Sequence, residues 1–161
     1  MALALPQSPR VKVFREIVSI LRSDPTLCRV IRKDCLRAWS GDVADAKAFS
    51  IEHAPALRLT PATTGDQFVT PDSMAGDLLI NCEILLRGND ADDLFNFWWA
   101  ICRAIYPTDP IQRSQIALQL QNAGARSGLV LFSQPAFDPD PDGVFFAGMG
   151  QMKIAIEAVY N

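Results

Sequence analysis

The sequence contains little of what most metal and redox sites are built from. It has one histidine, His53, and four cysteines, Cys28, Cys35, Cys82 and Cys102, none of which form a C-x-x-C pair. A structural zinc site needs four ligands at close spacing, commonly supplied by such pairs. We therefore expect four reduced, mostly buried thiols, no metal and no cofactor.

Long apolar runs are also missing. No segment approaches the roughly 18 uninterrupted apolar residues of a membrane span. The apolar opening Met1–Pro6 is too short for a signal-peptide core, and no basic segment precedes it. We expect a protein that works inside a cell or in a particle assembled there, with no membrane partner, and with residues 1–7 as a flexible tail.

The familiar catalytic motifs are absent. The sequence has no G-x-S-x-G and no phosphate-binding loop, and His53 has no Ser, Cys or acid nearby in a recognised arrangement. We expect no enzymatic activity, although a site assembled only in space stays open at this stage. A lone histidine at a strand end is usually a surface or hydrogen-bonded residue.

Two glycine-containing segments match known ligand-binding motifs only in part. Asp138–Gly143 has the carboxylates and glycine that begin a calcium loop, but Met149 stands where a bidentate carboxylate is required. This pattern predicts a stiff acidic turn between strands. Gly148-Met149-Gly150 lacks the following helix of a nucleotide loop, so we predict a bulge or bend in a strand.

What is present is typical of one globular domain. The chain has 161 residues, of which 49% are hydrophobic and 20% charged. This length supports a single core, and the composition is that of a folded rather than a disordered chain. We predict a single domain over residues 1–161.

Charge is distributed unevenly along the chain. Residues 1–37 hold eight Lys and Arg against three Asp and Glu, whereas the remainder holds seven against fifteen. A basic segment before an acidic body suits a contact with an acidic neighbour, and Arg10, Arg15 and Arg22 are candidate contact residues. The alternative is that these residues only line the solvent side of the first helix.

Periodicity and capping signals predict the elements. Helices are expected at 9–23, 91–106 and 110–123 with a short turn capped by Thr26, strands at 50–52, 56–60, 77–87, 129–132 and 151–160, and loops at 40–50, 61–75 and 137–143. Strands that occur in runs favour an antiparallel β-sheet with helices packed on one face, an α+β fold.

The helix at 91–106 is apolar around most of its circumference. One stripe, formed by Leu94, Phe97, Trp98, Ile101 and Ile105, is sufficient to cover a sheet. A second stripe contains Phe95, Trp99, Cys102 and Tyr106. Its aromatic members Phe95, Trp99 and Tyr106 are candidates for contact with another subunit, and the alternative is that the domain buries both stripes itself.

Four segments resemble a known group of proteins. They are Ala54–Pro61, Glu83–Trp98, Ala100–Pro107 and Asn122–Ala125. Over about residues 54–160 their pattern and order are similar to the small neck and tail-end proteins of tailed bacteriophages, nearest to the tail terminator, also called the tail-completion or minor tail protein. The N-terminal 50 residues show no such resemblance.

The resemblance implies a structural function in a virion assembled in the host cytoplasm. Members of this family are α+β domains that form a hexameric ring, which caps the tail tube and offers a surface to the head or neck. The acidic turn with Asp138, Asp140 and Asp142 is then a candidate surface facing the tube or a DNA channel. Other neck or head-completion connector proteins, and a non-viral ligand- or peptide-binding module, are the alternatives.

Overall fold

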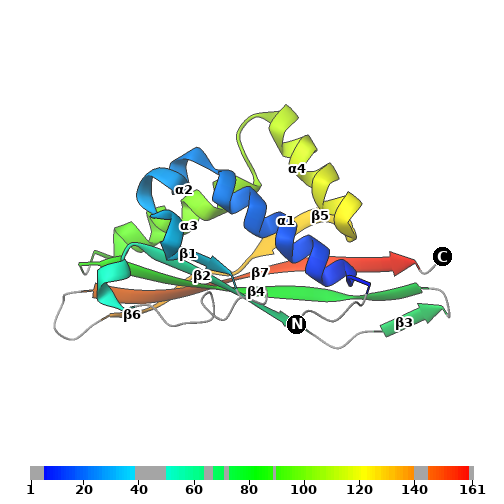
Figure 1. The fold of residues 1–161 in the computed structure, drawn as a ribbon, viewed down its shortest axis with the longest axis horizontal. Helices are drawn as coiled ribbons and strands as arrows, with labels where there is room; N and C mark the ends of the chain where they lie inside the picture. Colours follow the sequence, from blue (N-terminus) through cyan, green and yellow to red (C-terminus); the bar gives the residue numbers. More distant parts are fainter. Residues whose placement is uncertain are drawn as a thin grey trace.

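The structure, a computed structural model, describes residues 6–38, 50–63, 67–70, 73–88, 90–139 and 145–159. Its elements follow one another along the chain as shown in Figure 1. They are α1 (Pro9–Ser23), α2 (Pro25–Val30), η1 (Lys33–Cys35), β1 (Leu36–Ala38), η2 (Ile51–His53), β2 (Ala56–Thr63), β3 (Gln67–Thr70), β4 (Ser73–Arg87), α3 (Ala91–Ile105), α4 (Pro110–Ala123), β5 (Ala125–Phe132), β6 (Ala136–Pro139) and β7 (Phe145–Val159).

The strands form one seven-stranded sheet. Its order is β1-β2-β4-β7-β5, with β3 added to β4 and β6 added to β7. All of these pairs are antiparallel except β1 with β2. The long strands β4 and β7 pair from Ser73 opposite Val159 to Arg87 opposite Phe145, so they form the centre of the sheet. The predicted α+β fold with a mainly antiparallel sheet is confirmed.

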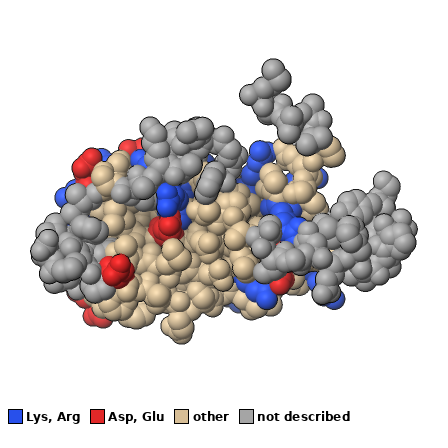
Figure 2. All heavy atoms as spheres, turned by 90° about the horizontal axis from the view of Figure 1, so that it is seen from below, with Lys and Arg blue, Asp and Glu red and all other residues tan. Residues whose placement is uncertain are grey.

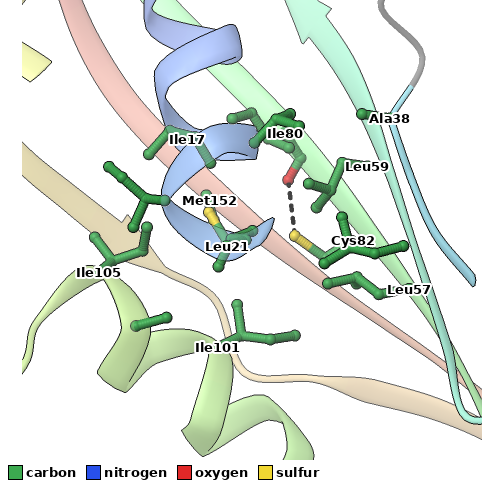
Figure 3. Close-up of a cluster of buried hydrophobic side chains, with 14 of the residues drawn as sticks. Ile17, Leu21, Ala38, Leu57, Leu59, Ile80, Cys82, Ile101, Ile105 and Met152 are labelled. Atoms are coloured by element: carbon green, nitrogen blue, oxygen red, sulfur yellow. Dashed lines mark hydrogen bonds between the residues drawn. The ribbon is translucent and has the colours of Figure 1, made fainter. Parts of the chain in front are cut away.

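The helices cover one face of this sheet (Figure 1). The alternating residues of β4 predicted to face the core are all buried, namely Leu78, Ile80, Cys82, Ile84 and Leu86. Figure 3 shows Ile17 and Leu21 of α1 and Ile101 and Ile105 of α3 pointing into the same cluster. Burying each of these side chains contributes about 1.5–3 kcal/mol, so this layer is the main source of stability.

The predicted helix boundaries follow from their caps. The side chains of Ser8, Asp90 and Asp109 each accept a hydrogen bond from a backbone N–H in the first turn of α1, α3 and α4. Gly124 ends α4 with a φ of 122°, a conformation that favours glycine. For α2 the prediction was wrong in detail, because the cap is Asp24 rather than Thr26.

The bulge or bend predicted at residues 148–150 is wrong. Strand β7 pairs with β4 without a shift in register there, with Gly148 opposite Ile84 and Gly150 opposite Cys82. Both glycines face α3, where an added Cβ would collide with the Leu94 side chain at Gly148 and with the Trp98 ring at Gly150. The glycines are therefore needed for close helix–sheet packing rather than for a change of direction.

Three further predictions about local structure are corrected. The expected exposed loop at 61–75 contains the end of β2, all of β3 and the start of β4. The expected strand at 50–52 is the 3₁₀ turn η2, and residues 137–139 of the expected turn belong to β6. Pairing with the long strand β4 or β7 outweighs the turn-rich local composition in both strand regions. The predictions for residues 1–5 and 40–49 lie outside the described residues.

Candidate interaction surfaces

Two of the three aromatic residues predicted to contact a partner are on the surface. Phe95 is 47% exposed and Trp99 is 63% exposed, both on the side of α3 that faces away from the sheet. The guanidinium of Arg103, one turn further on, lies 5.4 Å from the centre of the Trp99 ring. This cation–π contact holds the indole on the helix surface without burying it.

The third residue, Tyr106, is half-buried and forms hydrogen bonds within the subunit. Its hydroxyl accepts a hydrogen bond from the Val130 N–H at 2.5 Å and donates one to the Val130 carbonyl at 3.1 Å. Its ring makes an edge contact with Phe132 at 5.9 Å. Tyr106 therefore occupies backbone groups of β5, a strand at the end of the sheet order, and is not available as an exposed contact residue.

The predicted basic contact residues do not form one patch. Arg10 is half-buried and its Nε donates to the Asp77 carbonyl at 3.4 Å, which ties α1 to β4. Arg22 donates from Nη2 to the Leu36 carbonyl at 3.2 Å. Arg15 is exposed, and no described carboxylate forms an ion pair with it. Arg15 and Arg22 are both exposed, whereas Arg10 is half-buried.

Arg15 borders a hollow between α1 and α4 that the sequence alone did not reveal. The hollow has a volume of about 590 Å³. We refer to it as the basic hollow, and it is lined by Gln7, Lys12, Arg15, Glu16, Gln115, Leu118, Gln119, Asn122 and Ala123. Glu16 accepts a hydrogen bond from the Gln119 side-chain amide, so its carboxylate is already partnered within the subunit.

Acidic residues gather at the opposite end of the molecule. Asp90, Asp92 and Asp93 lie at the beginning of α3, and all three are exposed. Of the predicted acidic turn, Asp138 is exposed on β6, whereas Asp140 and Asp142 lie outside the described residues. The carboxylates of Asp92 and Asp93 have no ion pair among the residues with described positions.

The face of the sheet opposite the helices is a second surface that the sequence alone did not reveal. Leu131 is 54% exposed and Met149 is 48% exposed. Figure 2 shows this side as a mainly uncharged surface. The strand register places the following side chains on it, which together we call the open sheet face: Arg58, Asp77, Leu79, Asn81, Glu83, Leu85, Leu131, Ala147, Met149, Gln151 and Lys153.

The polar residues of the open sheet face are paired with one another. Arg58 and Glu83 form an ion pair, and this hydrogen bond raises the pKa of Arg58 above its ordinary value. Lys153 Nζ lies 3.1 Å from an Asp77 carboxylate oxygen. The Gln151 amide donates to Asn81 Oδ1 at 3.0 Å. The face therefore presents apolar side chains and internally neutralised charges rather than a net charge.

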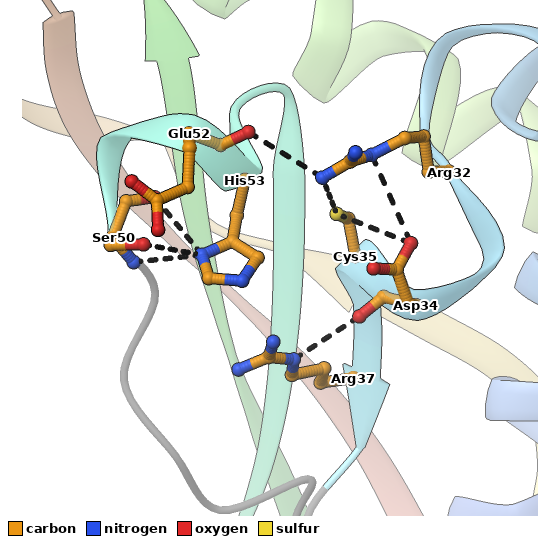
Figure 4. Close-up of polar contacts among 7 residues, drawn as sticks. All are labelled: Arg32, Asp34, Cys35, Arg37, Ser50, Glu52 and His53. Carbon is orange, nitrogen blue, oxygen red and sulfur yellow. Dashed lines mark hydrogen bonds and ion pairs between the residues drawn. The ribbon is translucent and has the colours of Figure 1, made fainter.

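The only histidine belongs to a local turn. Nδ1 of His53 accepts a hydrogen bond from the Ser50 N–H at 3.0 Å and lies 2.8 Å from Ser50 Oγ (Figure 4). Since the backbone N–H uses the Nδ1 lone pair, that nitrogen cannot also act as a general base toward the hydroxyl. Across the turn, Arg32 donates to the Glu52 carbonyl at 3.4 Å. These contacts close η2 against η1.

Burial suppresses the reactivity of two of the four cysteines, Cys82 and Cys102. All four are free thiols, with Cys35 and Cys82 buried, Cys102 half-buried and Cys28 exposed. Burial raises the pKa of Cys102 to about 11 and that of Cys82 higher still. Both thiols are therefore protonated at neutral pH and are poor nucleophiles. The described part of the chain holds no group of three or more metal-ligating side chains, and none of its helices is long and apolar enough to span a membrane.

Comparison with known proteins does not assign a function to these surfaces. No protein-family model matches the chain, and neither does any curated protein sequence.

Proposed function

We propose that this protein is a structural component of a tailed-phage particle, located in the tail or neck of the virion. It forms a ring, hexameric in the family it resembles, that terminates the tail tube and docks the tube to the head or neck. Its action is self-association combined with docking to other proteins, and it catalyses no reaction. An adjacent neck or head-completion connector is the nearest alternative within the same particle.

The open sheet face is the observation that supports this proposal most strongly. Leu79, Leu85, Leu131 and Met149 lie on one side of the sheet, and no helix in the described part of the chain covers them. Each square ångström of apolar surface removed from water contributes roughly 25 cal/mol, so a protein partner gains free energy by covering this face. Exposed apolar side chains grouped on one face, here Leu131 and Met149, favour protein–protein contacts.

The polar residues of the open sheet face favour a protein partner over nucleic acid. Phosphate contacts dominate nucleic-acid affinity and require cations that are available to the phosphate backbone. Here the two cations, Arg58 and Lys153, are both engaged by carboxylates of the same face. The sequence resemblance supplies the identity of the partners, which are the tail tube and the neck proteins.

The test is to combine light scattering of the purified protein with negative-stain electron microscopy, alone and after sedimentation with tail tubes of the source phage. We expect a closed ring, free or at the tube end. The double substitution Leu131→Glu with Met149→Glu should lower co-sedimentation at least about tenfold, because it places two carboxylates in an apolar contact.

The matched control is Gln112→Glu with Ser114→Glu, which adds the same charge on exposed positions of α4 that do not line the basic hollow. This control should leave docking to the tube unchanged. A chain that remains monomeric at high concentration, both alone and beside tail tubes, would contradict the proposed function.

A second candidate function is a ligand- or peptide-binding module. It is favoured by a hollow of about 420 Å³ between α2 and α3, whose apolar lining includes Leu27, Val30, Phe97 and Ala100. An extended apolar peptide fits a groove of this composition. Saturable quenching of tryptophan fluorescence by a hydrophobic peptide, with no ring formed under any condition, would favour this function over the first.

A further inference from the structure

Unpaired charges of opposite sign lie at the two ends of the molecule. The N-terminal half of α1 is tied to the sheet at Asp77, whereas α3 begins immediately beyond Arg87 (Figure 1). At roughly 3.4 Å per residue, the length of β4 between Asp77 and Arg87 is about 34 Å. That separation is several times the Debye length of about 8 Å at physiological ionic strength, so the two charged ends do not neutralise each other within one subunit.

At the first end, Lys12 and Arg15 project beside the basic hollow between α1 and α4. Both are exposed, and no described carboxylate pairs with either. Lys12 is also in an unfavourable position for its own helix, because the N-terminal end of a helix carries partial positive charge and favours anions. Lys12 therefore does not stabilise its own helix, but it can stabilise a carboxylate that approaches from another molecule.

At the second end, Asp92 and Asp93 project from the first turn of α3, with the capping residue Asp90 beside them. The partial positive charge at the N-terminal end of α3 favours acidic side chains at these positions, and both side chains are exposed to solvent. We call Asp90, Asp92 and Asp93 the acidic end. Its dimensions are those of a single helix turn, which suits entry into a hollow of about 590 Å³.

We propose that the basic hollow of one subunit receives the acidic end of the next copy of the chain. Lys12 and Arg15 pair with Asp92 and Asp93, and the amides of Gln115 and Asn122 complete the hydrogen bonding around the inserted turn. This inference rests on the proposed ring function and identifies the contact that closes the ring.

The geometry favours a second copy over other acidic partners. Because donor and acceptor surfaces are different patches at opposite ends of one chain, the contact is heterologous, and repetition of such contacts gives a closed ring when the rotation permits. Glu16 also lines the hollow, so the local excess of positive charge is small. A small excess matches one helix turn with a few carboxylates better than it matches a polyphosphate backbone.

The decisive experiment mixes two charge-reversed variants. Variant one carries Lys12→Glu and Arg15→Glu, so that both of its ends are acidic. Variant two carries Asp92→Lys and Asp93→Lys, so that both of its ends are basic. Each variant alone should assemble at least about tenfold more weakly than wild type, because like charges meet at every contact. An equimolar mixture should restore the ring, with the two variants alternating around it.

Circular dichroism and urea denaturation of each variant provide the folding control. Lys12→Glu places an anion at the N-terminal end of α1 and should not lower stability. A wild-type ring together with variants that assemble normally, or that fail to rescue each other when mixed, would overturn this contact and leave the ring function standing. A wild-type chain that never assembles would overturn both.

Discussion

Tyr106 shows how one hydroxyl group changes the role of a residue. In sequence it continues an aromatic stripe with Phe95 and Trp99, and the stripe as a whole resembles an interface. In the fold, its hydroxyl bonds both the N–H and the carbonyl of Val130, while its ring contacts Phe132. The residue thus closes part of a sheet edge that would otherwise present free backbone groups to other strands.

Tyr106→Phe should remove this protection while keeping the ring in place. We expect a loss of about 1–2 kcal/mol in the free energy of unfolding, because two backbone groups lose their partner. The specific measurement is amide exchange by NMR, in which the Val130 N–H should exchange faster. Phe132→Leu is the control, since it removes the ring contact but leaves the hydroxyl. Unchanged Val130 exchange in Tyr106→Phe would contradict the edge-closing role.

Helix α3 carries two adjacent tryptophans in opposite environments. Trp98 is 6% exposed, packs over Gly150 and donates from Nε1 to the Ser133 carbonyl at 3.1 Å. Trp99 is 63% exposed and contacts Arg103. Because successive residues of a helix point about 100° apart, one indole completes the core while its neighbour remains available to a partner.

Alanine substitutions at these two positions should separate the two roles. Trp98→Ala should lower the free energy of unfolding by about 3–5 kcal/mol, the typical cost of removing a large buried aromatic side chain. Trp99→Ala should cost less than about 1 kcal/mol, the size of an exposed cation–π contact. Urea denaturation at a concentration where the protein is dissociated measures both. Equal losses would show that Trp99 is packed inside the subunit.

At the scale of the whole molecule, stability is concentrated in the centre of the sheet and decreases toward α4. Strands β4 and β7 have neighbours on both sides and a helical layer above. In α4 only Leu120 is fully buried, and Ile111 and Leu118 are more than half exposed. Helix α4, with this one fully buried side chain, forms one wall of the basic hollow, where a neighbouring subunit would add contacts.

Hydrogen exchange of the dissociated protein should reproduce this gradient. Amides in the middle of β4 and β7 should exchange only by global unfolding, whereas those of α4 should exchange through local opening at a much lower free energy. Assembly should then slow exchange in α4 more than in any other helix. Protection of α4 equal to that of β4 in the dissociated protein would contradict this distribution.

Much of the local structure follows from short-range signals in the sequence. Side-chain capping at Ser8, Asp90 and Asp109, and the alternation of apolar residues along 77–87, predicted three helices, the central strand and the α+β class. Each of these signals depends on residues that are close together in sequence, so one helix turn or one short strand is sufficient to produce it. Whether Phe95 and Trp99 face solvent was not decided by the sequence, because the domain could have buried both stripes of the helix; the structure leaves both side chains exposed.

The contacts between residues far apart in sequence could not be predicted and are known from the fold alone. The pairing of β3 and β6 with long strands, the contact of Gly148 and Gly150 with α3, and the hydroxyl of Tyr106 on β5 all join segments far apart in sequence. The open sheet face and the basic hollow arise likewise, because a side chain is exposed or buried according to which element lies above it. Periodicity along one segment carries no information about that element.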